Sequence, residues 1–189
     1  LVYQAEENGA LTITQQLKTT PGAKVSDLLR FGMVMNLPYN MDQCQWNGRG
    51  PVENYSDRKL SQNVGIYKSS ADKLFFPYVR PQETGTMSDL RWWNQTDEGG
   101  FGFRVESDKM FSASALHYDL LSLDEGEEKH QRHSQSVEKS KYTNLFIDLL
   151  QQGVGGVNSW DADGRARKGH RVEYNDYTFK FRLSPKTVY

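Results

Sequence analysis

A glycine-rich stretch that ends in a tryptophan carries the side chains best suited to binding chemistry in this sequence. It reads Gly153-Val154-Gly155-Gly156-Val157-Asn158-Ser159-Trp160, and we call residues 153–160 the glycine loop. Glycine at three of four positions lets the backbone adopt positive φ, and the loop ends on a large aromatic side chain beside two polar ones. This pattern is typical of a binding residue. The residues alone leave a second interpretation open, in which Trp160 is a core residue and the glycines turn a corner.

The sequence has few other residue patterns that are typical of a catalytic site. The sequence has no phosphate-binding glycine loop that leads into a helix, no Gly-x-Ser-x-Gly elbow and no supported Cys-His arrangement. His130 and His133 lack an acidic or third histidine neighbour, so we favour a structural or surface role for them over a metal role. The sequence therefore predicts no catalytic residue and no metal ligand in this chain.

Several carboxylates and arginines fall in loops or at strand ends. They are Glu53, Asp57, Glu83 and Asp89, with Arg49, Arg58, Arg80 and Arg91 nearby in sequence. Such groups either bind ligand hydroxyls at a polar rim or pair with one another. We favour ion pairs and backbone ties, and keep the rim as the alternative.

Composition excludes some classes of partner. The 189 residues carry 23 basic and 24 acidic side chains, so the chain has no excess of positive charge that would favour binding to nucleic acid or to an anionic membrane. No apolar run approaches the roughly 20 residues that cross a bilayer, and Leu1–Ala10 lacks the features of a signal peptide. Cys44 is the only cysteine, so the chain forms no internal disulfide. We expect a soluble chain, with cytoplasm and periplasm both open, and a neutral or small polar ligand.

The elements that must position the glycine loop are predicted to be strands. Leu145–Leu150, directly before the loop, has apolar groups on both faces and should anchor it. Other expected strands are Ala10–Lys18, Leu28–Leu37, Asp42–Trp46, Asn63–Lys68, Phe75–Arg80, Met87–Trp93, Phe101–Glu106, Phe111–Leu116 and Tyr174–Leu183. A turn of helix is expected within His117–Leu123. Many short strands with frequent turns predict an all-β antiparallel sandwich.

Four sequence blocks, taken in order, resemble one known family. They are Gly48-Arg49-Gly50-Pro51-Val52-Glu53-Asn54-Tyr55-Ser56-Asp57-Arg58, Tyr78-Val79-Arg80-Pro81-Gln82-Glu83-Thr84-Gly85, Asp89-Leu90-Arg91-Trp92 and the glycine loop. Together they resemble the C-terminal, small-chain domain (domain 5) of the large β-galactosidases of glycoside hydrolase family 2. The resemblance runs from about Leu11 to Pro185.

The resemblance implies a fold and an activity. The fold would be an antiparallel supersandwich similar to galactose mutarotases, with residues 1–189 forming a single domain at the C-terminal end of a larger multidomain enzyme. That enzyme would hydrolyse terminal β-D-galactose residues with retention, through two glutamates about 5 Å apart on a TIM barrel that is not in this chain. Its Mg and Na ions would also belong to the barrel, and this chain would need no cofactor.

The resemblance also implies roles for particular residues. Trp160 matches a tryptophan that reaches into the active site of the barrel and stacks on the sugar, so we assign substrate binding to Trp160, Asn158 and Ser159, with Glu83 and Arg49 as weaker candidates. Val157 and Asn158 depart from the family pattern, which often has two aspartates there. The family's opening Arg-Ala-Pro-x-Asp-Asn-Asp segment is absent before Leu1. We therefore expect a trimmed domain with an exposed edge that favours self-association.

Two alternatives from other functional classes remain. A free-standing carbohydrate-binding module would bind sugar without the barrel. A mutarotase-like epimerase would need an acid and a base, with His117, His130, His133, His170 and Glu83 as the available groups.

Overall fold

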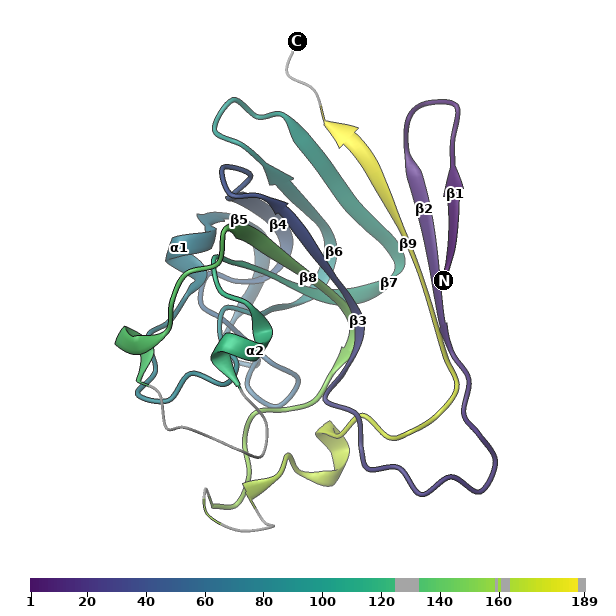
Figure 1. Cartoon of the computed structure of the whole chain (residues 1–189), viewed down its shortest axis with the longest axis vertical. Coiled ribbons are helices and arrows are strands. Elements are labelled where there is room, and N and C mark those ends of the chain that lie inside the picture. Colours follow the sequence, from purple (N-terminus) through teal and green to yellow (C-terminus); the bar gives the residue numbers. More distant parts are fainter. Residues whose placement is uncertain (125–132, 159, 161–163, 187–189) are drawn as a thin grey trace.

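The chain is built almost entirely from antiparallel strands in this computed structural model (Figure 1). The structure describes residues 1–124, 133–158, 160 and 164–186. Its strands are β1 (Val2–Ala5), β2 (Leu11–Leu17), β3 (Arg30–Pro38), β4 (Gln43–Gly50), β5 (Asn63–Ser70), β6 (Met87–Thr96), β7 (Gly102–Leu116), β8 (Tyr142–Gln151) and β9 (Tyr177–Lys186). Single helical turns are α1 (Ala71–Leu74), α2 (Leu120–Leu123), η1 (Ser134–Ser136) and η3 (Lys168–His170). The prediction of an all-β antiparallel fold is confirmed.

Strand β7 is central because it pairs with three neighbours. It pairs with β6 along both of its halves. It also pairs with β9 from Gly102 to Glu106 and with β8 from Ser112 to Leu116. The sheet therefore forks at β7: β9, β2 and β1 continue in one direction, and β8 and β3 in another. On the β6 side the sheet continues through β4 to β5.

Side chains replace backbone pairing at the fork. Ser107 donates a hydrogen bond from Oγ to the carbonyl of Lys180 at 2.8 Å, and the Lys109 ammonium donates to the carbonyl of Thr178 at 3.3 Å. These carbonyls belong to β9, where it separates from β7. The fork therefore leaves these two backbone acceptors satisfied.

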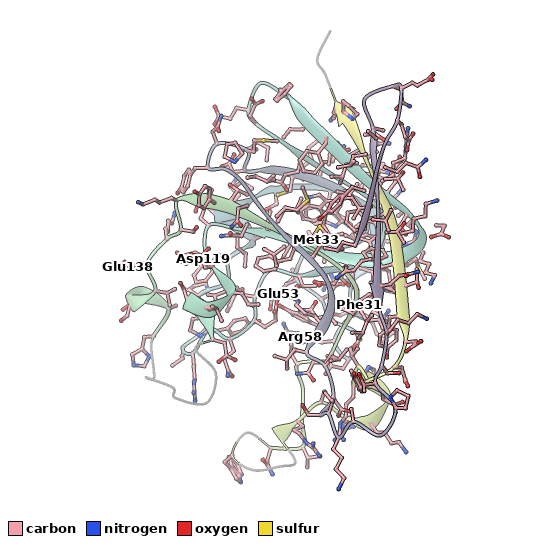
Figure 2. The ribbon with its side chains drawn as sticks, turned by 45° about the vertical axis from the view of Figure 1, so that its right-hand side comes forward. Phe31, Met33, Glu53, Arg58, Asp119 and Glu138 are labelled. Atoms are coloured by element: carbon pink, nitrogen blue, oxygen red, sulfur yellow. The ribbon has the colours of Figure 1, made fainter. Side chains whose placement is uncertain are left out.

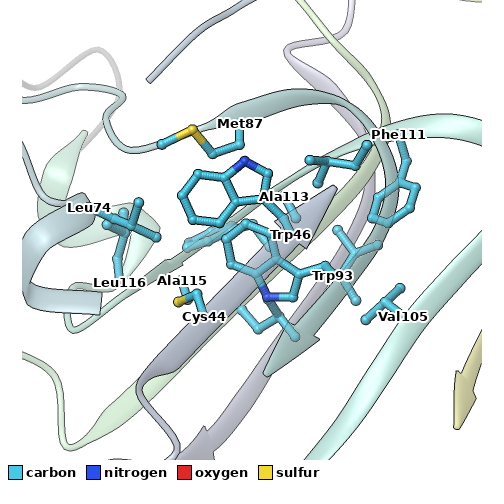
Figure 3. Packing of buried hydrophobic residues seen from close by; sticks show 14 of the residues in the cluster. Cys44, Trp46, Leu74, Met87, Trp93, Val105, Phe111, Ala113, Ala115 and Leu116 are labelled. Carbon is cyan, nitrogen blue, oxygen red and sulfur yellow. The ribbon is translucent and has the colours of Figure 1, made fainter. Parts of the chain in front are cut away.

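The two branches of the fork pack against each other around a shared core. Phe31 on β3 contacts Tyr177 on β9, with ring centroids 5.5 Å apart, and Gln15 on β2 donates to the carbonyl of Gly32 at 2.6 Å. Further along the core, the indole rings of Trp46 and Trp93 stack 5.4 Å apart (Figure 3). The buried cluster includes residues from both branches and from the β4–β6 layer, so the sheet folds over one core.

Strand predictions were most accurate where the apolar pattern alternates. In β9, Phe179 and Phe181 are buried while Thr178 and Lys180 are exposed, as expected for a half-buried strand. In β8, both faces are buried from residue 143 to residue 148, which confirms a well-anchored strand before the glycine loop. Helix α2 confirms the expected turn of helix.

Other strand predictions were wrong. Phe75–Arg80 is a connection and not a strand, which is the alternative that Pro77 and Pro81 favour in the sequence. The two short strands expected at Phe101–Glu106 and Phe111–Leu116 form one strand, β7, whose exposed middle hides its continuity in the sequence. Strand β1 was missed, and β4 extends through Gly50 into the stretch expected to be loop.

Candidate functional site

The glycine loop leaves the end of β8 and is held by backbone hydrogen bonds at its root. The amide of Gln152 donates to the carbonyl of Leu29 at 3.0 Å, and the amide of Gly153 donates to the carbonyl of His170 at 2.7 Å. In Figure 1 the segment after β8 runs below the sheet, beside the connection between β2 and β3. The loop therefore projects from a strand whose position is fixed by the core.

Trp160 is presented to solvent at the end of the loop. Its side chain is 83% exposed, and its amide donates to Oδ1 of Asn158 at 3.1 Å. Val154 and Val157 of the same loop are also exposed. This exposure excludes the core interpretation of Trp160. Asn158 and Trp160 lie together as expected, whereas Ser159 falls outside the described residues.

The glycines serve close approach rather than unusual backbone angles. Neither Gly153 nor Gly155 has positive φ, which corrects the expectation from the sequence. A Cβ on Gly153 would lie 2.3 Å from Oδ2 of Asp57 and 2.9 Å from Cβ of His170. At Gly155 the same carboxylate oxygen would be 3.3 Å away. Glycine occurs at positions 153 and 155 because the Asp57 carboxylate lies close to the loop backbone there.

Asp57 binds the glycine loop through both carboxylate oxygens. Oδ1 accepts the amide hydrogen of Val154 at 3.2 Å, and Oδ2 accepts that of Gly155 at 2.8 Å. Asp57 itself lies in a turn closed by two backbone hydrogen bonds between Tyr55 and Arg58, of 3.3 and 2.9 Å. Two of the recognised sequence blocks are therefore joined in space by one side chain.

The turn that carries Asp57 is fixed by a buried carboxylate. Glu53, 9% exposed, accepts hydrogen bonds from Arg58 and Tyr78, and from the amide of Gly85 at 2.6 Å. Figure 2 labels Glu53 and Arg58 in the same region of the fold. Burial, followed by the hydrogen bond to Glu53, raises the pKa of Tyr78. The Glu53 carboxylate is surrounded by donors of the protein itself, so this cluster stabilises the turn.

A second buried group of charges lies in β3, β8 and the connection before β6. Arg30 contacts Asp148 at 3.0 Å and Glu83 at 3.7 Å, and its guanidinium lies 5.0 Å from the centroid of the Phe146 ring. Burial raises the pKa of Asp148 to about 7, with Arg30 opposing the shift and Glu83 adding to it. Burial likewise raises the pKa of Glu83. Two carboxylates thus share one arginine near the root of the glycine loop.

The two weaker candidates for substrate binding are engaged within the fold. Glu83 pairs with Arg30 and accepts a hydrogen bond from Thr86 at 3.1 Å. Arg49 pairs with Asp89 at 2.6 Å and donates to the carbonyl of Gln62 at 2.7 Å. The structure places neither side chain in a described contact with Trp160 or Asn158, and both form the ion pairs favoured from the sequence.

Sequence reasoning missed the partner of Asp57 and the charge cluster of Arg30 and Asp148. The aspartate was expected to tie loop backbone, but the tie to the glycine loop has no local signal, because the two segments are about a hundred residues apart. Asp148 is the one charged residue in the predicted strand Leu145–Leu150. An unpaired charge in such a strand is itself a signal, since a buried carboxylate requires a buried cation.

The histidines do not assemble an acid and base pair among the described residues. His117 is buried and stacks on Tyr39, with ring centroids 3.8 Å apart. His133 contacts the carbonyl of Val79 at 3.1 Å, and His170 contributes its own carbonyl to the loop root. His130 lies outside the described residues. No group of three or more His, Cys, Asp or Glu side chains suited to a metal ion occurs in the described part of the chain.

Comparison with known proteins identifies the family. Residues 1–183 match the family described as "Beta galactosidase small chain". The chain belongs to this family. The small-chain domain is 30% identical to a β-galactosidase of Priestia megaterium over 186 residues, which are 98% of this chain and 17% of that protein.

Other β-galactosidases also match this chain over only a small part of their own length. The β-galactosidase BgaC of Bifidobacterium adolescentis is 33% identical over 84% of this chain and 15% of its own length, and a Vibrio cholerae β-galactosidase is 36% identical over 70% and 12%. The small-chain domain therefore corresponds to a small part of each of these large proteins. None of the described helices is long and apolar enough to cross a membrane.

Proposed function

We propose that this domain completes the sugar-binding site of a β-galactosidase. The full enzyme would hydrolyse terminal non-reducing β-D-galactose residues by a retaining mechanism, with its two glutamates on a TIM-barrel domain of the same parent chain. The domain would supply Trp160 to that site for binding the galactoside and for positioning an acceptor. The Mg and Na ions of the family belong, in this proposal, to the barrel.

The exposure of Trp160 carries this proposal. A tryptophan that is 83% exposed at the end of a tied loop contributes little to the core and is accessible to a ligand outside the described fold. The face of an indole packs well on the apolar C–H face of a pyranose, and the amide side chain of Asn158 stands next to it. This arrangement supports sugar binding and supplies no nucleophile or acid.

The first test replaces Trp160 with alanine in the full-length enzyme. We expect the KM for galactosides to rise roughly tenfold to a hundredfold, because burying a large apolar side chain is worth about 1.5–3 kcal/mol. Transfer of galactose to an acceptor should fall as well. Val157→Ala, on the same loop, is the matched control and should change KM little. An unchanged KM in the Trp160→Ala enzyme would reject this role.

A second experiment separates the alternatives from other functional classes. Galactose and lactose are titrated into the 189-residue chain while tryptophan fluorescence is followed, and mutarotation of galactose is assayed in parallel. The proposed accessory role predicts no response in either experiment. Saturable binding by the chain alone would favour a carbohydrate-binding module, and accelerated mutarotation would favour an epimerase.

We also propose that the isolated chain associates with itself through an exposed edge. Strand β5 pairs with β4 on one side and lies at one end of the described sheet. Its Val64 and Ile66 are 48% and 62% exposed. An edge strand with outward apolar side chains is a favourable surface for a second chain.

A further inference from the structure

We propose that Asp57 is a positioning residue that holds Trp160 in its binding-competent place. This inference rests on the proposed function, because it gives Asp57 a role through Trp160 and not through contact with the sugar. Asp57 belongs to a sequence block about a hundred residues before the glycine loop. It is nevertheless the side chain that binds the backbone of that loop at Val154 and Gly155.

The chemistry of a carboxylate suits this contact. Each oxygen of Asp57 accepts one backbone N–H, at 3.2 and 2.8 Å, so two loop donors that have no strand partner are satisfied by one rigid group. An asparagine would offer one acceptor oxygen, and its amide nitrogen would face a second donor. An alanine would offer none. The three side chains therefore form a graded series.

The support for Asp57 is itself rigid. Tyr55, 2% exposed, begins the turn, and the Arg58 guanidinium that ends it lies 5.3 Å from the centroid of the Tyr55 ring. Arg58 also pairs with the buried Glu53. A displacement of Asp57 would thus disturb buried groups, whereas Val154 and Gly155, the loop residues that it binds, are exposed. The Asp57 carboxylate therefore fixes the position of the loop relative to the core.

The close approach of Gly153 to Asp57 reinforces the contact between the loop and the carboxylate. A Cβ at Gly153 would lie 2.3 Å from Oδ2 of Asp57, so only glycine lets the loop approach the carboxylate so closely. Both sides of the contact are thereby specified: a glycine backbone on one side and an acceptor-only side chain on the other. Val154 and Gly155, which the carboxylate binds, are six and five positions before Trp160 in the chain.

Loss of Asp57 should act on binding and leave the chemical step intact. Without the two hydrogen bonds the loop samples other positions, and the apparent dissociation constant rises by the inverse of the fraction that stays competent. The glutamates of the proposed mechanism are not part of this chain. We therefore expect a change in KM with kcat nearly unaltered.

The test uses the full-length enzyme with Asp57→Ala and Asp57→Asn. We expect the KM for galactosides to rise about tenfold in the alanine variant, as for a loop that is competent one-tenth of the time, and by less in the asparagine variant. Asp176→Ala is the matched control, because Asp176 also accepts a backbone N–H, from Thr19 at 2.8 Å, in a loop without a proposed site residue. It should leave KM unchanged.

A double-mutant cycle separates positioning from general damage. In the Trp160→Ala background, Asp57→Ala should add no further rise in KM, because the residue it positions is already gone. An additive effect, an equal fall in kcat for both Asp57 variants, or an unchanged KM in Asp57→Ala would overturn the inference. If Trp160→Ala alone has no effect, the proposed function fails first. If Trp160→Ala raises KM and Asp57→Ala does not, only the role of Asp57 fails.

Discussion

Individual residues at the glycine loop are specified by what they touch more than by their own conformational preferences. Gly153 has ordinary backbone angles, yet its neighbours leave no room for a methyl group. Trp160 shows the reverse condition, since its side chain has ample space and is largely exposed. One position is restricted by packing inside the chain, and the other is open to solvent.

Gly153→Ala should separate the loop from its anchor. The added methyl group would displace the Asp57 carboxylate and lower the free energy of unfolding of the 189-residue chain by about 1.5 kcal/mol, the low end for hydrogen bonds to a charged group. Urea denaturation measures the change. Gly169→Ala is the control, because a Cβ there meets no atom within 4 Å. Equal stability of the two variants would show that the Asp57 carboxylate does not exclude a methyl group at Gly153.

Residue roles were predictable in part. The ion pairs of Arg49 and Glu83 agree with the interpretation favoured from the sequence, because carboxylates near arginines are a local pattern, whereas the residues alone left the exposure of Trp160 open. The contact between Asp57 and the glycine loop was not predictable, because it depends on how β4 and β8 are placed by the whole sheet. The assignment of substrate binding to Trp160, Asn158 and Ser159 stays a prediction.

At the scale of elements, strands β3 and β8 together enclose the buried carboxylate of Asp148 near the loop root. Gly32 faces Asp148 across this pair at a register shift, and a Cβ on Gly32 would lie 2.2 Å from Oδ1 of Asp148. The groups that face Asp148 are Arg30 and Glu83, with Phe146 beside the arginine. The pair of strands can therefore respond to pH.

Asp148→Asn should change how stability depends on pH. The pKa of Asp148 is raised from 3.8 to about 7, so between these values the folded chain holds a proton that the unfolded chain has lost. Its stabilising contribution is full below about pH 4 and is lost as the pH rises through about 7. The wild-type free energy of unfolding should fall by up to about 4 kcal/mol over this range relative to the variant. Urea denaturation at pH 4.5, 6 and 8 measures it.

Asp176→Asn provides the control for this pH dependence. Hydrogen bonds from Thr19 and Lys18 lower the pKa of Asp176 to about 2, so its contribution is present above about pH 4 and is lost as the pH falls through about 2. This variant should retain the wild-type slope between pH 4.5 and 8. The role of Asp148 would be refuted by an identical slope in wild type and Asp148→Asn.

Element predictions succeeded where one face is buried and failed where a strand changes partner. Strand β9 alternates cleanly because a single face meets the core. Strand β7 leaves β9 and joins β8 through residues 107–110, where it is largely exposed, so the sequence shows two apolar runs separated by a polar gap. Periodicity reports burial, and it cannot distinguish a bend within a strand from a loop between strands.

At the scale of the whole molecule, the described sheet closes over one core but keeps open edges. The forked arrangement was not predictable from the strand count, because β7 has three partners only after β8 and β9 are placed. Strand β5 lies at one end of the described sheet path, where Val64 and Ile66 remain accessible. The shape of the sheet therefore determines which apolar side chains remain available to a second chain.

Ile66→Lys should reduce self-association of the 189-residue chain. A lysine on an edge strand opposes pairing between edges, so the dissociation constant should rise by at least tenfold, or about 1.4 kcal/mol. Sedimentation at several concentrations measures it. Thr178→Lys adds the same charge at an exposed position of β9, an interior strand, and should have less effect. A monomeric wild-type chain, or equal effects of the two lysines, would contradict the proposed edge contact.

The pairing of β2 with β9 has a consequence for synthesis on the ribosome. Leu11 lies opposite Leu183, so β2 can pair early with β1 but cannot form its ladder with β9 until residue 183 has been translated. At about 5–20 residues per second, the apolar face of β2 waits on the order of ten seconds for its partner. Over that interval Ile13, which is buried in the folded chain, lacks its cross-strand neighbour Phe181. Slowing translation should therefore lower the yield of folded chain, although the free energy of unfolding of the folded chain stays the same.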